Sequence, residues 1–172
     1  PICKREWRDV NANNSKDIGD FIGALSMIIM ENCGGASGPI WGSAFRSAGK
    51  STEGKTELTV QDVADLLQAA VKGVQATGER SFGRGAVVGD KTLIDALVPC
   101  ADEWTACAGE GCDMKTSFTR AAEKAVAGAA ATAEHAAHMG RAGTVGERSI
   151  GYPDAGAFAL GEIFTKLGEL VQ

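Results

Sequence analysis

The stretch Gly34-Gly35-Ala36-Ser37-Gly38-Pro39 stands between two helical patterns, and no strand pattern precedes it. Upstream, apolar residues recur at spacings of three and four over residues 18–29, as along one face of a helix. Downstream, Pro39 suits the first position of a second helix. A helix N-terminus carries free N–H groups and the positive end of the helix dipole. These six residues, the glycine corner, therefore predict an anion site on an all-helical scaffold.

Apolar residues at helical spacing predict six helices, and no segment shows the sustained alternation of a strand. The expected helices cover about 18–30, 40–49, 60–74, 93–104, 118–133 and 157–170. Glycine-rich loops are expected at 78–90 and 140–156, with a shorter break at 108–113. Thr59 with Asp62 resembles a capping start, and Asp154 is a plausible cap of the last helix. We therefore predict an all-α antiparallel bundle, in which the alanine-rich fifth helix lies centrally because small side chains let neighbours approach closely.

The length of 172 residues suits one domain, expected over residues 15–172 after a polar N-terminal arm at 1–14. A formal net charge of −5 argues against a protein that binds nucleic acid by neutralising phosphates. The sequence shows no membrane-spanning run and no signal peptide. Five cysteines without a C-x-x-C pair favour reduced thiols in a cytoplasmic protein.

Three short motifs have ordinary interpretations. Gly49-Lys50-Ser51 lacks the earlier glycine and the preceding strand that a phosphate loop of the Walker type requires. His135 and His138 lie one helical turn apart, but no third metal ligand is apparent, and an exposed polar face is the better interpretation. In Gly89-Asp90-Lys91-Thr92, Asp90 or Thr92 is expected to cap the helix that follows.

Four motifs together resemble one family. They are Gly-Gly-Ala-Ser-Gly-Pro at 34–39, Gly-Asp-Lys-Thr at 89–92, Gly-Arg-Ala-Gly-Thr-Val-Gly-Glu-Arg-Ser-Ile-Gly at 140–151 and Tyr-Pro-Asp-Ala-Gly-Ala at 152–157. In this order and spacing they are similar to the DhaL family, the nucleotide-binding L subunit or C-terminal domain of dihydroxyacetone kinases. The resemblance runs from about Lys16 to the end of the chain.

The resemblance implies a barrel of antiparallel helices that binds ADP or ATP across the loops at one end. It implies phosphoryl transfer to a small ketose held on a partner K subunit, in glycerol metabolism, with a phosphocarrier protein as a further partner if ADP is resident. In this role Ser37 and Arg141 would contact phosphate, and Gly78 and Leu93 would line the adenine side. The full set of implied nucleotide contacts is Gly35, Ala36, Ser37, Gly38, Gly78, Thr92, Leu93, Arg141, Pro153, Asp154 and Ala155; no catalytic residue is assigned.

One family feature has no counterpart in this sequence. The family carries an aspartate-rich segment near its N-terminus that holds Mg²⁺ on the nucleotide, and residues 1–20 do not match it. We therefore expect that segment and its two flanking helices to lie upstream of Pro1 or to have been lost, and we predict no metal ligand in this chain. If they have been lost, the alternatives are a non-catalytic nucleotide-sensing module or a helical bundle that holds a lipid.

Overall fold

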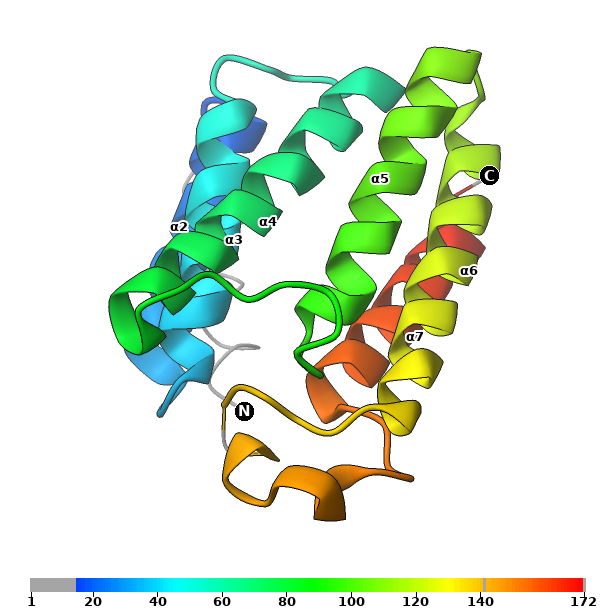
Figure 1. Ribbon diagram of the computed structural model, residues 1–172. Helices are drawn as coiled ribbons and strands as arrows, with labels where there is room; N and C mark the ends of the chain where they lie inside the picture. Colours follow the sequence, from blue (N-terminus) through cyan, green and yellow to red (C-terminus); the bar gives the residue numbers. More distant parts are fainter. Residues whose placement is uncertain (1–14, 141, 172) are drawn as a thin grey trace. The chain divides into compact units, whose positions relative to one another are not determined.

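The computed structural model describes residues 15–140 and 142–171, so the arm expected at 1–14 lies outside the described residues. All regular structure in the described part is helical, which confirms the all-α prediction (Figure 1). The chain divides into two compact units, one ending at Gly85 and the other starting at Ala86. Among the described residues, no helix combines the length and the apolar character needed to cross a membrane.

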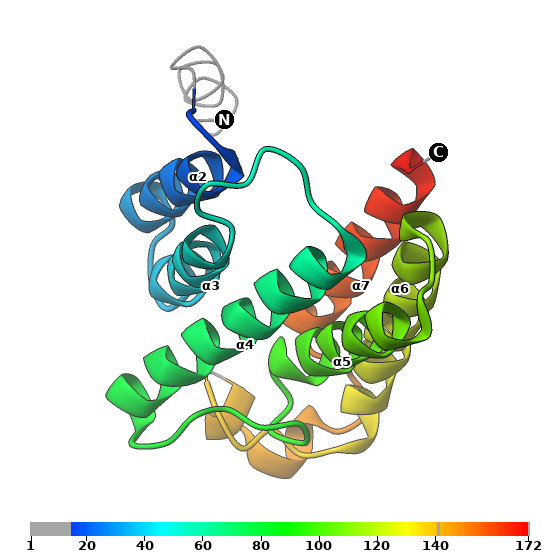
Figure 2. The same cartoon turned by 90° about the horizontal axis from the view of Figure 1, so that it is seen from above.

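The first unit contains three helices, α2 (Ile18–Asn32), α3 (Ser37–Ser51) and α4 (Val60–Phe82). Helices α2 and α3 lie side by side and are seen nearly end-on in Figure 2. The Ser26 hydroxyl donates to the Gly42 carbonyl oxygen at 2.7 Å, and Thr77 Oγ1 donates to Ser43 Oγ at 2.7 Å. These bonds join α2 to α3 and α3 to α4. The contacts are close because glycine faces the neighbouring helix at several positions.

The expected start of α4 is confirmed. Thr59 Oγ1 accepts from the Asp62 N–H at 3.2 Å, and the Asp62 carboxylate accepts from the Thr59 N–H at 2.9 Å. The two bonds form a capping box, which satisfies N–H groups that the helix itself leaves without a partner. The Lys55 ammonium lies 2.8 Å from the same carboxylate. The hydrogen bond from Lys55, together with those from Thr59, lowers the pKa of Asp62 to about 2.

Two expected helix boundaries in this unit are wrong. Helix α3 begins at Ser37, so Pro39 is its third residue rather than its first; proline is tolerated because the first four N–H groups of a helix have no partner inside it. Helix α4 continues past Gly78 to Phe82, and the loop begins only at Gly83, whose φ of 77° ends the helix. A glycine inside a helix, such as the buried Gly78, costs about 1 kcal/mol of helix stability relative to alanine. The packing of α4 against its neighbours offsets this cost.

The second unit contains α5 (Ile94–Glu110), α6 (Met114–Ala131) and α7 (Ala155–Leu170). The break between α5 and α6 is shorter than expected, because α5 continues to Glu110. Three short 3₁₀ turns lie between α6 and α7, namely η1 (Thr132–Glu134), η2 (Ala142–Thr144) and η3 (Gly146–Ser149). Two of them, η2 and η3, fall inside the loop expected at 140–156. His135 follows η1 as its cap, so His135 and His138 do not share a helix.

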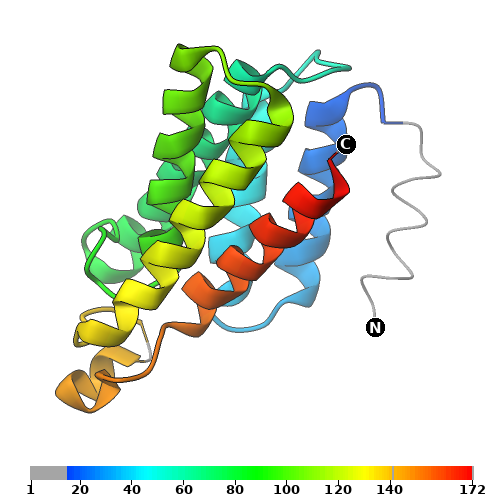
Figure 3. The same cartoon turned by 90° about the vertical axis from the view of Figure 1, so that its right-hand side faces the viewer.

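Helix α6 lies between α5 and α7, as the alanine stripe predicted (Figure 3). A side chain at Gly128 would run into the carbonyl oxygen of Asp95, so α5 and α6 are almost in backbone contact there. At the other end of the pair, the buried Trp104 ring meets Phe118 edge-on, with ring centroids 4.9 Å apart. The core of this unit is therefore built from small residues at one end and aromatic residues at the other.

Candidate functional site

The entrances of α3 and α5 differ from those of the other described α-helices. Side chains of Asp17, Thr59, Asp113 and Asp154 cap α2, α4, α6 and α7. The N-caps of α3 and α5 are Ala36 and Leu93, and neither makes a side-chain capping bond. Both residues belong to the set of nucleotide contacts that the sequence predicts. At the entrance of α3, the absence of a side-chain cap leaves N–H groups and the positive end of the helix dipole available to an anion.

The glycine corner presents the entrance of α3 at the surface of the first unit. Gly35 has a φ of 66°, in the left-handed region that glycine adopts without strain. Ala36 and Ser37 are exposed, whereas Gly38 is buried. A side chain at Gly38 would run into the carbonyl oxygen of Cys33, so the turn closes only around a glycine. The corner can therefore offer the Ser37 hydroxyl and backbone N–H groups to one phosphate.

Gly78 does not lie in a loop. It is buried inside α4, next to Thr77, whose hydroxyl reaches Ser43 on α3. Its predicted contact with adenine would therefore have to come from the backbone surface of a helix. Arg141 lies outside the described residues.

The loop before α5 is organised by two buried aspartates. Asp95, in the first turn of α5, accepts from the N–H groups of Gly89 and Thr92, each at 2.7 Å. The Asp90 carboxylate accepts from the Val87 N–H at 2.9 Å. The Thr92 hydroxyl accepts from the Ile94 N–H at 3.2 Å, so the expected capping role of Thr92 is confirmed. Asp95 was not foreseen as the residue that shapes this loop.

Lys91 is a second residue of this region whose role the sequence analysis missed. Its side chain is 3% exposed, and its φ of 60° is unusual for a residue other than glycine. The ammonium donates to the carbonyl oxygens of His135 and Ser149, at 3.0 and 2.6 Å. The Ser149 hydroxyl in turn accepts from the Ala137 N–H at 2.8 Å. Lys91 thus joins the entrance of α5 to both ends of the segment 135–149.

The entrance of α7 lies against the entrance of α5. A side chain at Gly156 would contact Leu93 Cβ at 3.2 Å and Asp154 Oδ1 at 3.1 Å. The structure therefore brings together Leu93, Asp154 and Ala155, three of the predicted contacts. The Asp154 N–H donates to Thr132 Oγ1 at 2.8 Å, which fixes the loop to the end of α6.

Asp154 is also the cap of α7, as expected. Its carboxylate accepts from the Ala157 N–H at 2.8 Å. Burial raises the pKa of Asp154 above its ordinary value, and the neighbouring Asp95 adds to the effect. The Ala157 and Gly156 N–H groups and the Lys91 ammonium act in the opposite direction.

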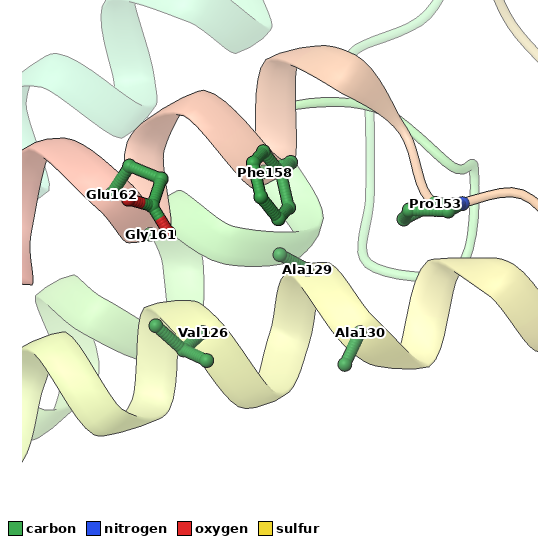
Figure 4. Close-up of a pocket in the computed structure, with 7 residues that line it drawn as sticks. All are labelled: Val126, Ala129, Ala130, Pro153, Phe158, Gly161 and Glu162. Carbon is green, nitrogen blue, oxygen red and sulfur yellow. The ribbon is translucent and has the colours of Figure 1, made fainter.

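Pro153 lines a small groove between α6 and α7, which Figure 4 shows in close-up. The groove has a volume of about 180 Å³ and is lined by Val126, Ala129, Ala130, Pro153, Phe158, Gly161 and Glu162. Glu162 is the one charged side chain in this lining, and it is negative. The groove is therefore suited to an apolar group and not to a phosphate.

Within residues 15–140 and 142–171, no group of three His, Cys, Asp or Glu side chains is arranged to hold a metal ion. Asp17 caps α2 and also accepts from the Gly54 N–H, so its carboxylate stabilises the fold. The described residues do not fit a magnesium site.

Comparisons with known proteins support the resemblance seen in the motifs. The DAK2 domain matches residues 3–169. The PEP-dependent dihydroxyacetone kinase, ADP-binding subunit DhaL, of Escherichia coli (strain K12) is 32% identical over 145 residues, which are 84% of this chain and 66% of that protein. The corresponding subunit of PEP-dependent dihydroxyacetone kinase 2 of Listeria innocua is 34% identical over 143 residues, 83% of this chain and 63% of that protein.

The third relative is a longer protein. L-erythrulose 1-kinase of Mycolicibacterium smegmatis is 36% identical over 141 residues, 79% of this chain and 22% of that protein. The chain thus spans slightly less than two thirds of the two DhaL subunits and a smaller part of the longer kinase. The four motifs all fall inside the matched DAK2 domain. The expected kinship with DhaL is confirmed, and the chain belongs to the DAK2 domain family.

Proposed function

We propose that this chain binds the adenine nucleotide of a dihydroxyacetone-type kinase and supports phosphoryl transfer to a small ketose held on a partner K subunit. The observation that carries the proposal is the entrance of α3. It is exposed, has no side-chain cap, and begins at the glycine corner, the first of the four motifs. The similarity to subunits named as ADP-binding supports the same ligand.

In this proposal the chain binds and orients the nucleotide. The N–H groups of the glycine corner and the Ser37 hydroxyl hold phosphate oxygens, and Arg141 adds a planar guanidinium. Leu93, Thr92 and the loop Pro153–Ala155 contribute contacts in the second unit. Phosphoryl transfer depends mainly on positioning and charge neutralisation, so residues that only bind the nucleotide still contribute to the rate. That residues 15–172 act as one nucleotide-binding domain is part of the proposal.

Several finer points remain proposals. The relatives are named for dihydroxyacetone and L-erythrulose, both small ketoses, and either fits this chain. A resident ADP recharged by a phosphocarrier agrees with the PEP-dependent relatives, and ATP is the alternative donor. Magnesium enters only through the resemblance, and the described residues supply no ligand cluster for it. A place in glycerol metabolism and in the cytoplasm belongs to the same proposal.

The test is calorimetric titration of the full chain with ADP, in the presence of Mg²⁺ and in excess chelator. Saturable binding of one ADP per chain supports the proposal. Loss of binding in chelator would identify metal ligands outside the described residues, whereas unchanged binding would favour the nucleotide-sensing alternative over the kinase. No binding under either condition would overturn the site assignment.

A further inference from the structure

Cys107 and Cys112 lie at the end of α5, within a turn of defined geometry. The Cys112 N–H donates to the Cys107 carbonyl oxygen at 2.9 Å, and the Gly111 N–H donates to the Ala108 carbonyl oxygen at 3.3 Å. Gly111 has a φ of 74°. This combination of bonds around a left-handed glycine is the Schellman motif, which ends many helices.

The motif brings the side chains of its first and last residues together. In an uninterrupted helix, residues five apart would be separated by about 7.5 Å along the axis, too far for a disulfide. Here the chain reverses at Gly111, and the backbones of Cys107 and Cys112 are one hydrogen bond apart. The neighbouring Cys112 thiol contributes to the raised pKa of the Cys107 thiol, as expected when the two side chains are close. Both are free cysteines in the structure.

The two thiols differ in their surroundings. Cys112 is partly exposed, and Arg120 Nη1 donates to its sulfur at 3.5 Å. The same guanidinium is paired with Glu103 and Glu110, so it is held in place next to the sulfur. Cys107 is buried, and burial raises the pKa of its thiol. Cys112 is therefore the thiol accessible to a reagent from solution, and Cys107 is the thiol placed to react with Cys112.

We propose that Cys107 and Cys112 are a redox-active pair that forms a reversible disulfide across the turn between α5 and α6. With a low-molecular-weight disulfide such as oxidised glutathione, the Cys112 thiolate attacks one sulfur, forms a mixed disulfide and releases one glutathione thiolate. The Cys107 thiolate then attacks the Cys112 sulfur and releases the second. Each released thiolate takes up one proton given up by a cysteine, so two protein thiols are oxidised and one glutathione disulfide is reduced to two thiols.

The test equilibrates the full chain with glutathione from fully reduced to fully oxidised, alkylates the remaining thiols and digests the protein after Glu, Lys and Arg. Cleavage after Glu103, Glu110 and Lys115 separates the cysteines into peptides 104–110 and 111–115. We expect these two peptides to be recovered as one linked species, two hydrogen atoms lighter than their sum, and to separate again on reduction. Glutathione retained on Cys112 while Cys107 remains alkylated would overturn the proposal.

Variants separate the turn geometry from simple proximity in sequence. Cys112→Ser should abolish the linked species, and Cys33→Ser, a free cysteine in the other unit, should leave it unchanged. In Gly111→Ala, nothing lies within 4 Å of the added Cβ, so the change acts only on the left-handed backbone. It should lower the equilibrium constant for the disulfide by up to about thirtyfold. An undiminished constant in a folded Gly111→Ala variant would show that the turn does not promote the bond.

Discussion

The Lys91 ammonium donates a hydrogen bond of 2.6 Å to the Ser149 carbonyl oxygen, 58 residues further along the chain. A second bond to the His135 carbonyl oxygen completes a bridge from the entrance of α5 to the segment that precedes α7. The ammonium is almost fully buried, and the carboxylate of Asp154 lies close enough to feel its charge. The second unit thus uses a buried cation to hold its longest loop.

Replacing Lys91 by methionine should destabilise the fold strongly. The variant preserves most of the side-chain volume, but it leaves the carbonyl oxygens of His135 (partly buried) and Ser149 (buried) without their donor and removes the cation from among acidic groups. We expect a loss of about 2–4 kcal/mol in the free energy of unfolding, measured by urea denaturation. Lys115→Met, at an exposed position on α6, is the matched control and should change stability by less than about 0.5 kcal/mol. Equal stability of both variants would mean that the bridge contributes nothing.

Ser37→Ala should weaken ADP binding without affecting the fold. The hydroxyl is exposed at the entrance of α3, and under the proposed function its removal deletes one hydrogen bond to phosphate. The expected loss is about 1 kcal/mol, or roughly fivefold in the dissociation constant, measured by calorimetry. Ser15→Ala is the control, because Ser15 and Ser37 lie beyond opposite ends of α2, a helix about 22 Å long. Unchanged affinity in Ser37→Ala would remove the glycine corner from the site.

Ionisation of the Asp154 carboxyl group should lower the free energy of unfolding as the pH rises. Burial raises its pKa in the folded state, so between about pH 3.9, the unfolded value, and the folded value the folded protein binds more protons than the unfolded chain. Stability contributed by this group therefore falls with increasing pH in that window. Asp154→Asn, which retains a capping oxygen but does not titrate, should abolish this part of the slope in urea denaturation between pH 4 and 7.

The capping role of Asp154 is tested separately. Asp154→Ala removes the acceptor for the Ala157 N–H and should cost about 1 kcal/mol in unfolding free energy, whereas Asp154→Asn should retain most of the cap. If alanine and asparagine were equivalent at neutral pH, the bond to Ala157 would have no role in stability.

Gly128→Ala should destabilise the second unit. The added methyl group would run into the Asp95 carbonyl oxygen, so α5 and α6 would have to separate at a cost of about 1–3 kcal/mol. Gly109→Ala is the matched control in the facing helix, because nothing lies within 4 Å of its added Cβ. There the better helix propensity of alanine should raise the melting temperature. The two glycine variants should therefore shift the melting temperature in opposite directions.

Local patterns predicted much of the helical structure correctly. The apolar spacing along α2 and the Thr59–Asp62 capping box depend on residues three or four apart. Both could therefore be predicted from the sequence without the tertiary structure. The alanine stripe of α6 likewise predicted its place between two helices. The boundaries at Ser37 and Gly78 were wrong because glycine and proline weaken a helix locally, whereas close packing between helices offsets that cost.

The sequence by itself determined the all-helical class and, through four ordered motifs, the DAK2 domain family. It also placed Leu93 and Asp154 in one predicted site, and the tertiary structure brings their loops into contact. Only the tertiary structure revealed that Lys91 is buried and bonded to Ser149, and that Asp95 shapes the loop before α5. The physical reason is range: helix periodicity and capping act within a few residues, whereas the partner of a buried charge is chosen by the packing of distant segments.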